Sequence, residues 1–210
     1  MEVEASTAGT WTIRAGHVTG LDSRPHGDRD AFAVAFFDDR LLVVVASTAA
    51  PAHEGSVAKA RVDDVLKRAR GWPRWANAGT LAREVTKDHP GYAEDSLLVL
   101  LMPGRTPAGD WCTGAMAVVG TRVSTWVVTD NSALSLGSNR GDGETNRLMI
   151  HDGEVLCAGT AAAIAGCSPT WLWRAPPTPP EFLARLSECG PSADDRTLVA
   201  LWAGHYGLDR

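Results

Sequence analysis

The chain has 210 residues, 44% of them hydrophobic, so it is long enough to bury a sizeable core. Its formal net charge of −5 argues against nucleic acid or an anionic membrane as a partner, because both are normally bound by a basic surface. The sequence has neither the long apolar run of a membrane span nor the N-terminal pattern of a signal peptide, so a cytoplasmic location is expected.

The first predicted elements are strands. Residues 10–18 have the pattern of a strand, and a polar loop rich in turn-forming residues follows them. Two apolar runs separated by Asp38, Asp39 and Arg40 then predict a β-hairpin. The second arm, Leu41–Ala46, is continuously aliphatic, which predicts a central strand buried on both faces.

The pattern becomes helical after this hairpin. Apolar residues between Ala52 and Arg70 recur at the spacing of one helical face, and Gly71 and Pro73 end the predicted helix. A second helix is predicted over Thr80–Lys87.

The rest of the chain is predicted to be mostly strands. A proline-rich loop at 175–180 precedes a predicted helix over Glu181–Leu186, and the polar segment 138–146 is predicted to be a surface loop. The predicted strands are 96–102, 115–119, 123–128, 131–136, 148–151, 154–158 and 197–202, with a short helix at 161–164.

This order of elements predicts an α+β fold rather than an alternating βαβ fold. Two sheets packed together and covered by helices would satisfy it. The sequence shows no internal repeat and no long linker, so residues 1–210 are expected to form a single domain. It also lacks a Gly-x-Ser-x-Gly nucleophile elbow and a phosphate-binding P-loop, which argues against an α/β-hydrolase and a P-loop enzyme.

Short polar segments stand at the ends of several predicted strands. In chain order they are Asp28-Arg29-Asp30, Ala46-Ser47-Thr48, Thr129-Asp130-Asn131, Ala158-Gly159-Thr160 and Asp194-Asp195-Arg196-Thr197. With the predicted helices between them, this series resembles the metal-dependent (PPM, or type 2C) protein phosphatase family over nearly the whole chain. The resemblance implies a four-layer α-β-β-α sandwich of two mostly antiparallel sheets flanked by helices, with a metal site at one edge of the sheets.

The resemblance also implies which acidic residues hold metal. Members of the family bind two Mn²⁺ or Mg²⁺ ions, which need several carboxylate ligands and activate a water for attack on phosphorus. Asp30, Asp194 and Asp130 match acidic positions of the family.

Two carboxylates of the family are missing from this chain. Ser47, followed by Thr48, stands where the family has the metal-bridging Asp and a Gly, and Gly159 stands where it has another metal-binding Asp. Losing two negative charges lowers the affinity for the ions at least roughly tenfold on a Coulomb estimate. Binding of Mn²⁺ or Mg²⁺ is therefore expected to be weak or absent.

Other residues are weaker candidates. Arg24 or Arg29 could bind phosphate, because a guanidinium matches phosphate geometry, but either could also be a solvated loop charge. His53 and Glu54 could supply replacement metal ligands, although a polar helix start explains them better. The four cysteines have no CxxC spacing and are expected to be buried, reduced thiols.

These features favour a pseudophosphatase, a regulatory or protein-binding module that docks a phosphoprotein or another protein. Trp72, Trp75, Trp171 and Trp173 could anchor such a partner, with packing under loops as the alternative. The competing hypothesis is an active or weakly active Ser/Thr phosphatase, in which Asp30, Asp194 and either Asp130 or Glu54 hold one ion. A domain of unrelated function that only echoes the family is a third alternative.

Overall fold

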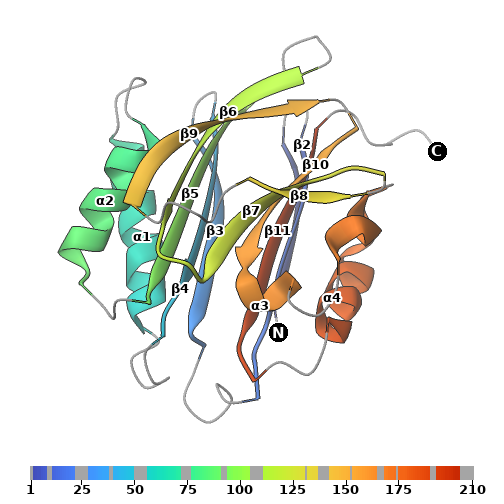
Figure 1. The fold of residues 1–210 in the computed structure, drawn as a ribbon, viewed down its shortest axis with the longest axis horizontal. Helices are drawn as coiled ribbons and strands as arrows, with labels where there is room; N and C mark the ends of the chain where they lie inside the picture. Colours follow the sequence, from blue (N-terminus) through green and yellow to red (C-terminus); the bar gives the residue numbers. More distant parts are fainter. Residues whose placement is uncertain are drawn as a thin grey trace.

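The described part of the chain forms two antiparallel β-sheets that stack face to face (Figure 1). In spatial order, the first sheet consists of β1 (Glu2–Ala8), β2 (Trp11–Val18), β11 (Arg196–Ala203), β10 (Val155–Thr160), β7 (Val123–Val128) and β8 (Ala133–Ser135). The second consists of β3 (Asp30–Phe37), β4 (Arg40–Ser47), β5 (Ser96–Pro103), β6 (Trp111–Val119) and β9 (Asp142–His151). The computed structural model describes residues 2–8, 11–21, 28–37, 40–49, 56–71, 77–90, 94–104, 111–130, 132–136, 142–151, 153–164, 168–173, 175–189 and 193–203.

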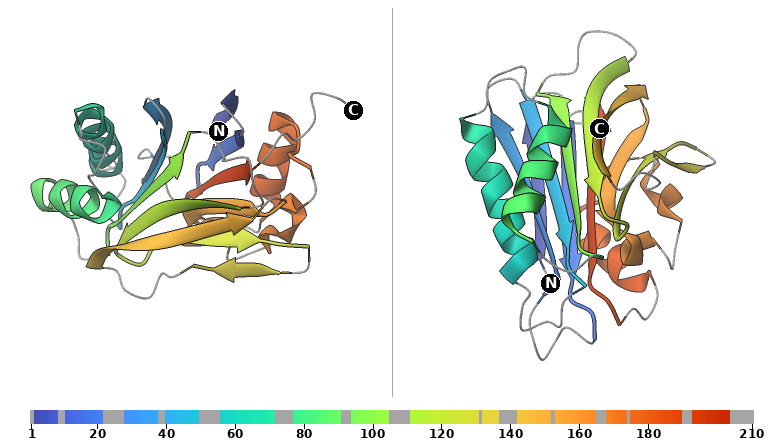
Figure 2. Two further views of the ribbon diagram at one scale, coloured as in Figure 1. Left: turned by 90° about the horizontal axis from the view of Figure 1, so that it is seen from above. Right: turned by 60° about the vertical axis from the view of Figure 1, so that its left-hand side comes forward.

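Helices cover the outer face of each sheet, which completes the expected four layers (Figure 2). The helices α1 (Ser56–Arg70) and α2 (Ala78–Asp88) pack on the second sheet. The first sheet carries α3 (Ala161–Ile164), the 3₁₀ helix η2 (Pro169–Leu172) and α4 (Pro179–Glu188). The fold is therefore the α+β sandwich that the sequence predicts.

The strand β4 shows why an uninterrupted aliphatic run belongs at the centre of such a sandwich. Leu41, Val43 and Val45 face the core between the two sheets, while the alternate residues Leu42 and Val44 face the core beneath α1 and α2. Successive side chains of a strand point to opposite faces, so both faces of β4 must be apolar. The prediction of a strand buried on both faces is confirmed.

Local capping fixes the starts of two helices. Asn77 precedes α2, and its side chain accepts a hydrogen bond from the backbone N–H of Thr80 at 2.7 Å. Thr178 and Glu181 form a capping box at the start of α4, where prolines occupy the first turn. Both arrangements satisfy backbone N–H groups that have no partner within the helix.

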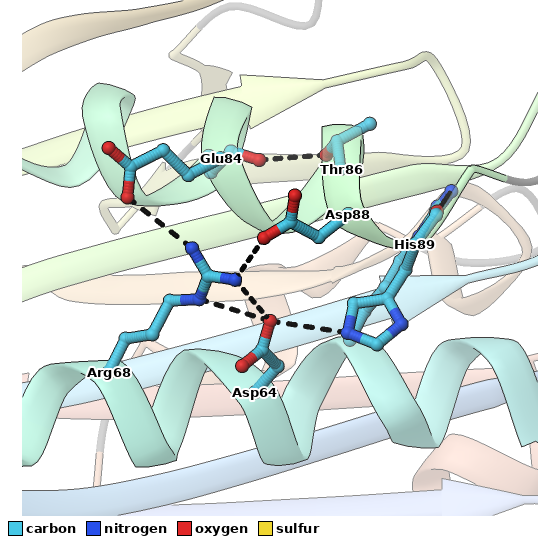
Figure 3. A network of polar contacts seen from close by, with 8 residues as sticks. Asp64, Arg68, Glu84, Thr86, Asp88 and His89 are labelled. Atoms are coloured by element: carbon cyan, nitrogen blue, oxygen red, sulfur yellow. Dashed lines mark hydrogen bonds and ion pairs between the residues drawn. The ribbon is translucent and has the colours of Figure 1, made fainter.

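A network centred on Arg68 joins α1 to α2 on the outer surface (Figure 3). The Arg68 guanidinium donates to Asp64 at 3.0 Å, to Glu84 at 3.4 Å and to Asp88. His89 lies 3.2 Å from the same Asp64 carboxylate. Because α1 supplies the arginine and α2 supplies two of its acidic partners, the network fixes how the two helices lie against each other.

Two edge strands depart from the sequence-based prediction. The segment 138–146 was expected to be a surface loop, but its residues 142–146 belong to β9, which pairs with β6. The strand β1 was not predicted at all. Both strands pair on one side only, and the described side chains Thr145, Asn146 and Arg147 are exposed, so the apolar pattern of a buried strand is weak there.

The described cysteines differ in whether they form a disulfide bond. Cys112 and Cys157 are free and buried, as expected, and burial raises the pKa of the Cys112 thiol to about 11. Cys189, in contrast, is disulfide-bonded, so the expectation of four reduced thiols is wrong. Among the described helices, none has the length and hydropathy that crossing a membrane requires.

Candidate functional site

Most of the residues that the sequence singles out meet at one end of the sandwich. In the second sheet, β3 begins at Asp30, which pairs with Ser47 at the end of β4. In the first sheet, β10 ends at Thr160 and β11 begins at Arg196, directly after Asp194. Antiparallel pairing thus brings strand ends that are distant in sequence to the same end of the molecule.

Asp130 does not join this group. It follows the C-terminal end of β7, whereas the clustered residues lie beyond the N-terminal end of that strand. Six residues of extended strand separate the two ends by about 20 Å. Asp130 is also exposed, in contrast to Asp30.

Asp30 is a buried carboxyl group, only 7% exposed. It accepts a hydrogen bond from the Thr197 hydroxyl at 3.3 Å, and the Ser47 hydroxyl is its second hydrogen-bond partner. Burial, reinforced by the nearby Asp195 carboxylate, raises the pKa of Asp30 to about 7, although the two hydrogen bonds oppose the shift. The charged form of this group is therefore poorly stabilised in the site.

The residue after Ser47 serves the structure rather than a metal site. The buried Thr48 hydroxyl donates to Asp95 at 2.7 Å, and the same carboxylate accepts the backbone N–H of Ala49. Arg61 of α1 lies 3.6 Å from the other oxygen of Asp95, and both of these side chains are almost fully buried. Thr48 thus belongs to a buried ion-pair network that joins α1 to the ends of β4 and β5.

Gly159 lies within β10, where it pairs with Leu198 on one side and with Ser124 on the other. A Cβ atom at this position would lie 2.5 Å from the carbonyl oxygen of Thr197. That distance is far below van der Waals contact, so an aspartate could not enter without moving the backbone. The local packing therefore leaves no room for the carboxylate that the resemblance expects at this position.

Asp194 is held by two arginines. Arg29 Nη1 donates to Asp194 Oδ1 at 3.3 Å, and Arg122 Nη2 lies 3.6 Å from Asp194 Oδ2. Arg122 Nε also donates to the Ser47 hydroxyl at 3.3 Å, and its positive charge acts on Asp30. One guanidinium thus lies among Ser47, Asp194 and Asp30.

The backbone around Arg122 is held from both sheets. Its N–H donates to the Ser96 hydroxyl at 2.8 Å, and its carbonyl accepts the N–H of Ala161 at 2.8 Å. Gly120 forms the preceding turn at a positive φ of 80°, where a Cβ would lie 2.4 Å from the Asp95 carbonyl. Only glycine fits this approach, which places Arg122 at the site.

A second polar group lies beside Asp30. His17 Nδ1 is 2.9 Å from the Thr197 hydroxyl, and His17 Nε2 is 3.2 Å from Asp28. Asp195 accepts backbone N–H groups from Gly20 and Arg29. Burial disfavours the charged form of Asp28, but the hydrogen bond from Thr19 and the interaction with His17 together lower its pKa.

This second group has the composition of a metal site. The ligand atoms of His17, Asp28 and Asp195 all lie within 4.8 Å of one another, so they could hold one ion. They are not the residues that the resemblance assigns to metal. All three already have hydrogen-bond or ion-pair partners within the protein, so an ion would have to compete for them.

The donor set at the family position does not fit two divalent cations. A pair of close cations needs several carboxylates, whereas Ser47 offers a neutral hydroxyl and Gly159 only backbone. Asp30 has a pKa of about 7, and Asp194 is paired with two guanidinium groups. A fixed positive charge lies beside the remaining ligands, and it would repel an incoming cation.

Sequence reasoning missed four of the residues that matter here. Asp28 and Asp195 are neighbours of residues that were selected, while His17 and Arg122 had only a strand end and a glycine turn as local signals. Arg24, His53 and Glu54 lie outside the described residues, as do Trp72 and Trp75. Trp171 packs against Phe182 with ring centroids 5.6 Å apart, and Trp173 packs against the same core, which fits the packing alternative.

Comparison with known proteins identifies the fold. No family model matches the chain, and no curated protein matches it in sequence. Three solved structures illustrate what it is similar to. RsbX in complex with magnesium matches with a TM-score of 0.71 at 11% identity, over 97% of this chain and 100% of that one.

The other two comparisons agree. The RsbU and RsbW domains of Rv1364c from Mycobacterium tuberculosis match with a TM-score of 0.66 at 16% identity, over 95% of this chain and 63% of that one. The catalytic domain of the serine/threonine phosphatase PstP, in complex with two manganese ions, matches with a TM-score of 0.58 at 13% identity, over 92% and 98%. The chain therefore has the fold of the PP2C-type (PPM) protein phosphatases.

Proposed function

We propose that residues 1–210 form a PPM-like pseudophosphatase domain, a regulatory or protein-binding module with an incomplete dinuclear metal site. One observation carries the proposal. The guanidinium of Arg122 lies between Ser47 and Asp194, where the resemblance expects cations among carboxylates. Binding of Mn²⁺ or Mg²⁺ at this position is expected to be weak or absent.

The chemistry explains why this arrangement favours binding over hydrolysis. Hydrolysis of a phosphate ester in this fold depends on metal ions that lower the pKa of a water and aim it at phosphorus. A guanidinium can hold an anion by hydrogen bonds, but it is not a Lewis acid for water. The end of the sandwich formed by Asp30, Ser47 and Asp194 is thus suited to recognition rather than turnover.

The expected partner is a protein or a phosphoprotein in the cytoplasm, rather than nucleic acid or a membrane. The Rv1364c structure supports this class of role, since the chain that this protein resembles contains both an RsbU and an RsbW domain. Of the two phosphate-binding candidates, Arg29 is 21% exposed and lies beside Asp194, whereas Arg24 lies outside the described residues.

The second candidate function is a weakly active phosphatase with a rearranged site. The group His17, Asp28 and Asp195 favours it, because these residues could hold a single ion next to Asp30. One ion without a bridging carboxylate would activate water less than a pair does. This candidate requires metal-dependent turnover that depends on Asp30 or His17.

A phosphate-ester assay separates the two candidates. Purified wild type, Asp30→Ala and the control Asp130→Ala would be incubated with p-nitrophenyl phosphate and a phosphoserine peptide, with Mn²⁺ or with EDTA. The pseudophosphatase proposal predicts that the three proteins give the same background rate in both conditions. Mn²⁺-dependent turnover that is lost in Asp30→Ala and kept in Asp130→Ala would establish the active enzyme instead.

A further inference from the structure

The guanidinium of Arg122 lies where the resemblance to the phosphatase family expects two cations. Arg122 Nε donates to Ser47 and Arg122 Nη2 faces Asp194, so the guanidinium spans the gap between the two sheets' strand ends. Ser47 also hydrogen-bonds Asp30, so the guanidinium and the buried carboxyl group share one neighbour. These contacts connect Asp30 and Asp194, the two acidic residues of the family positions that lie at this end of the sandwich.

The fold fixes the backbone position of Arg122. Its backbone is hydrogen-bonded to Ser96 of the second sheet and to Ala161 after β10 of the first. The turn at Gly120 leaves no room for a side chain and so determines where β7 starts. The Arg122 side chain is 27% exposed, so most of it is shielded from water.

The positive charge of Arg122 lies among several acidic groups. Asp30 is buried next to Asp195, and Asp194 is adjacent in sequence, so several acidic groups lie close together. Arg29 and Arg122 both offset the repulsion among these acidic groups, and Arg122 is the one whose charge also acts on Asp30. A divalent metal would supply that charge in the fold's metal-bound members, and a guanidinium can supply it here without any ion.

We propose that Arg122 is a built-in counter-ion that takes the place of the metal ions, so that this domain folds without divalent cations and excludes them from the site. The inference rests on the proposed function, because it explains how the incomplete site remains stable. The remaining carboxylates can then bind a cation when the Arg122 guanidinium is removed.

Thermal unfolding with and without Mn²⁺ tests this inference directly. Wild type is expected to show the same Tm in EDTA and in Mn²⁺. Arg122→Met is expected to lower the Tm in EDTA by roughly 2–6 °C, and Mn²⁺ should recover at least half of that loss, because the ion replaces the missing charge. Arg122→Lys keeps the charge, so it should lose less and gain nothing from Mn²⁺.

Double variants show where the ion binds. Arg122→Met/Asp194→Asn should lose the recovery by Mn²⁺, whereas Arg122→Met/Asp28→Asn should keep it, because Asp28 belongs to the neighbouring His17 group. The matched surface control Arg185→Met removes an exposed arginine that pairs with Glu188, and it should change neither the Tm nor its response to Mn²⁺.

Two results would overturn the inference. The first is a Tm of wild type that rises in Mn²⁺ as much as that of Arg122→Met, which would mean that the guanidinium does not exclude the ion. The second is an Arg122→Met protein whose Tm is unchanged, or is lowered with no recovery in Mn²⁺. Neither result depends on turnover, so failure here and failure of the pseudophosphatase proposal are separate observations.

Discussion

Arginine–carboxylate contacts serve two regions of this molecule in different ways. On the outer surface between α1 and α2, Arg68 contacts three carboxylates, and two of them, Glu84 and Asp88, are about half exposed. At the end of the sandwich, Arg61 and Arg122 face carboxylates beneath or beside the core. Water can replace a lost partner of Arg68, and also reaches Asp194, which is 44% exposed, but it cannot reach the Arg61–Asp95 pair.

The number of ion pairs that an arginine makes therefore says little about how much it stabilises the fold. Arg68 makes more contacts than Arg61, yet Arg61 is 2% exposed and its partner Asp95 is fully buried. The first arginine orients two helices, and the second neutralises a charge that has no access to solvent. Substitutions that remove each arginine should therefore separate the two regions by free energy of unfolding.

The largest effect is expected for Arg61→Met. The substitution keeps much of the side-chain volume but takes the Arg61 guanidinium away from the buried Asp95 carboxylate, and it removes the hydrogen bonds to the His89 carbonyl. The free energy of unfolding should fall by about 3–5 kcal/mol. Urea denaturation measures it, and a loss below about 1 kcal/mol would show that the pair is not an essential part of the buried network.

The next largest effect is expected in how the free energy of unfolding depends on pH, because of the pKa of Asp30. Its pKa is about 7 in the folded protein and ordinarily near 3.8, so the folded state retains a proton that the unfolded chain releases. Stability should therefore fall as pH rises from about 4 to about 7, by at most about 1.4 kcal/mol per pH unit, and should change little from this group above pH 7.

Asp30→Asn isolates this contribution, because asparagine is neutral and nearly the same shape. Urea titrations of both proteins at several pH values between 4 and 8 should show a shallower slope for the variant, with the variant the more stable protein above pH 7. Parallel pH profiles for the two proteins would contradict the raised pKa.

A smaller effect is expected for Gly159→Ala. The added Cβ would lie 2.5 Å from the Thr197 carbonyl, so β10 and β11 must separate locally. The cost should be about 1–3 kcal/mol, as for other overpacked sites. Gly71→Ala is a suitable control, because its nearest contact would be 3.9 Å away. Equal stability of Gly159→Ala and wild type would mean that an aspartate could be restored there easily.

The smallest effect is expected for Arg68→Met. Its carboxylate partners on α2 can be solvated when the guanidinium is removed, so the loss should stay below about 1 kcal/mol and shrink further at high salt. Denaturation at low and high ionic strength measures both quantities. A loss as large as that of Arg61→Met would remove the distinction between the two regions.

Much of the fold could be predicted because its signals are local. The run Leu41–Ala46 is aliphatic at every position, which only a strand buried on both faces requires. The predicted hairpin is confirmed, and its register brings Asp30 opposite Ser47 because a short turn brings the outer ends of a strand pair together. The edge strand β9 was missed because one side of it is exposed and polar.

The site was only partly predictable, because its geometry depends on residues far apart in sequence. Asp30 and Thr197 are hydrogen-bonded across 167 positions, and no periodic pattern connects them. Arg122 belongs to no sequence motif, because the turn at Gly120 and hydrogen bonds to both sheets determine its position. Asp130 also stands at a strand end, but that end lies at the opposite side of the sandwich from Asp30 and Asp194.

We propose that this PP2C-type fold lacks a dinuclear metal centre because Ser47 and Gly159 stand where the family resemblance expects carboxylates and Arg122 supplies the positive charge. Titration calorimetry of Mn²⁺ into the metal-free wild-type protein tests it most directly. We expect no saturable binding of a pair of ions. Saturable binding that approaches two ions per chain would contradict it.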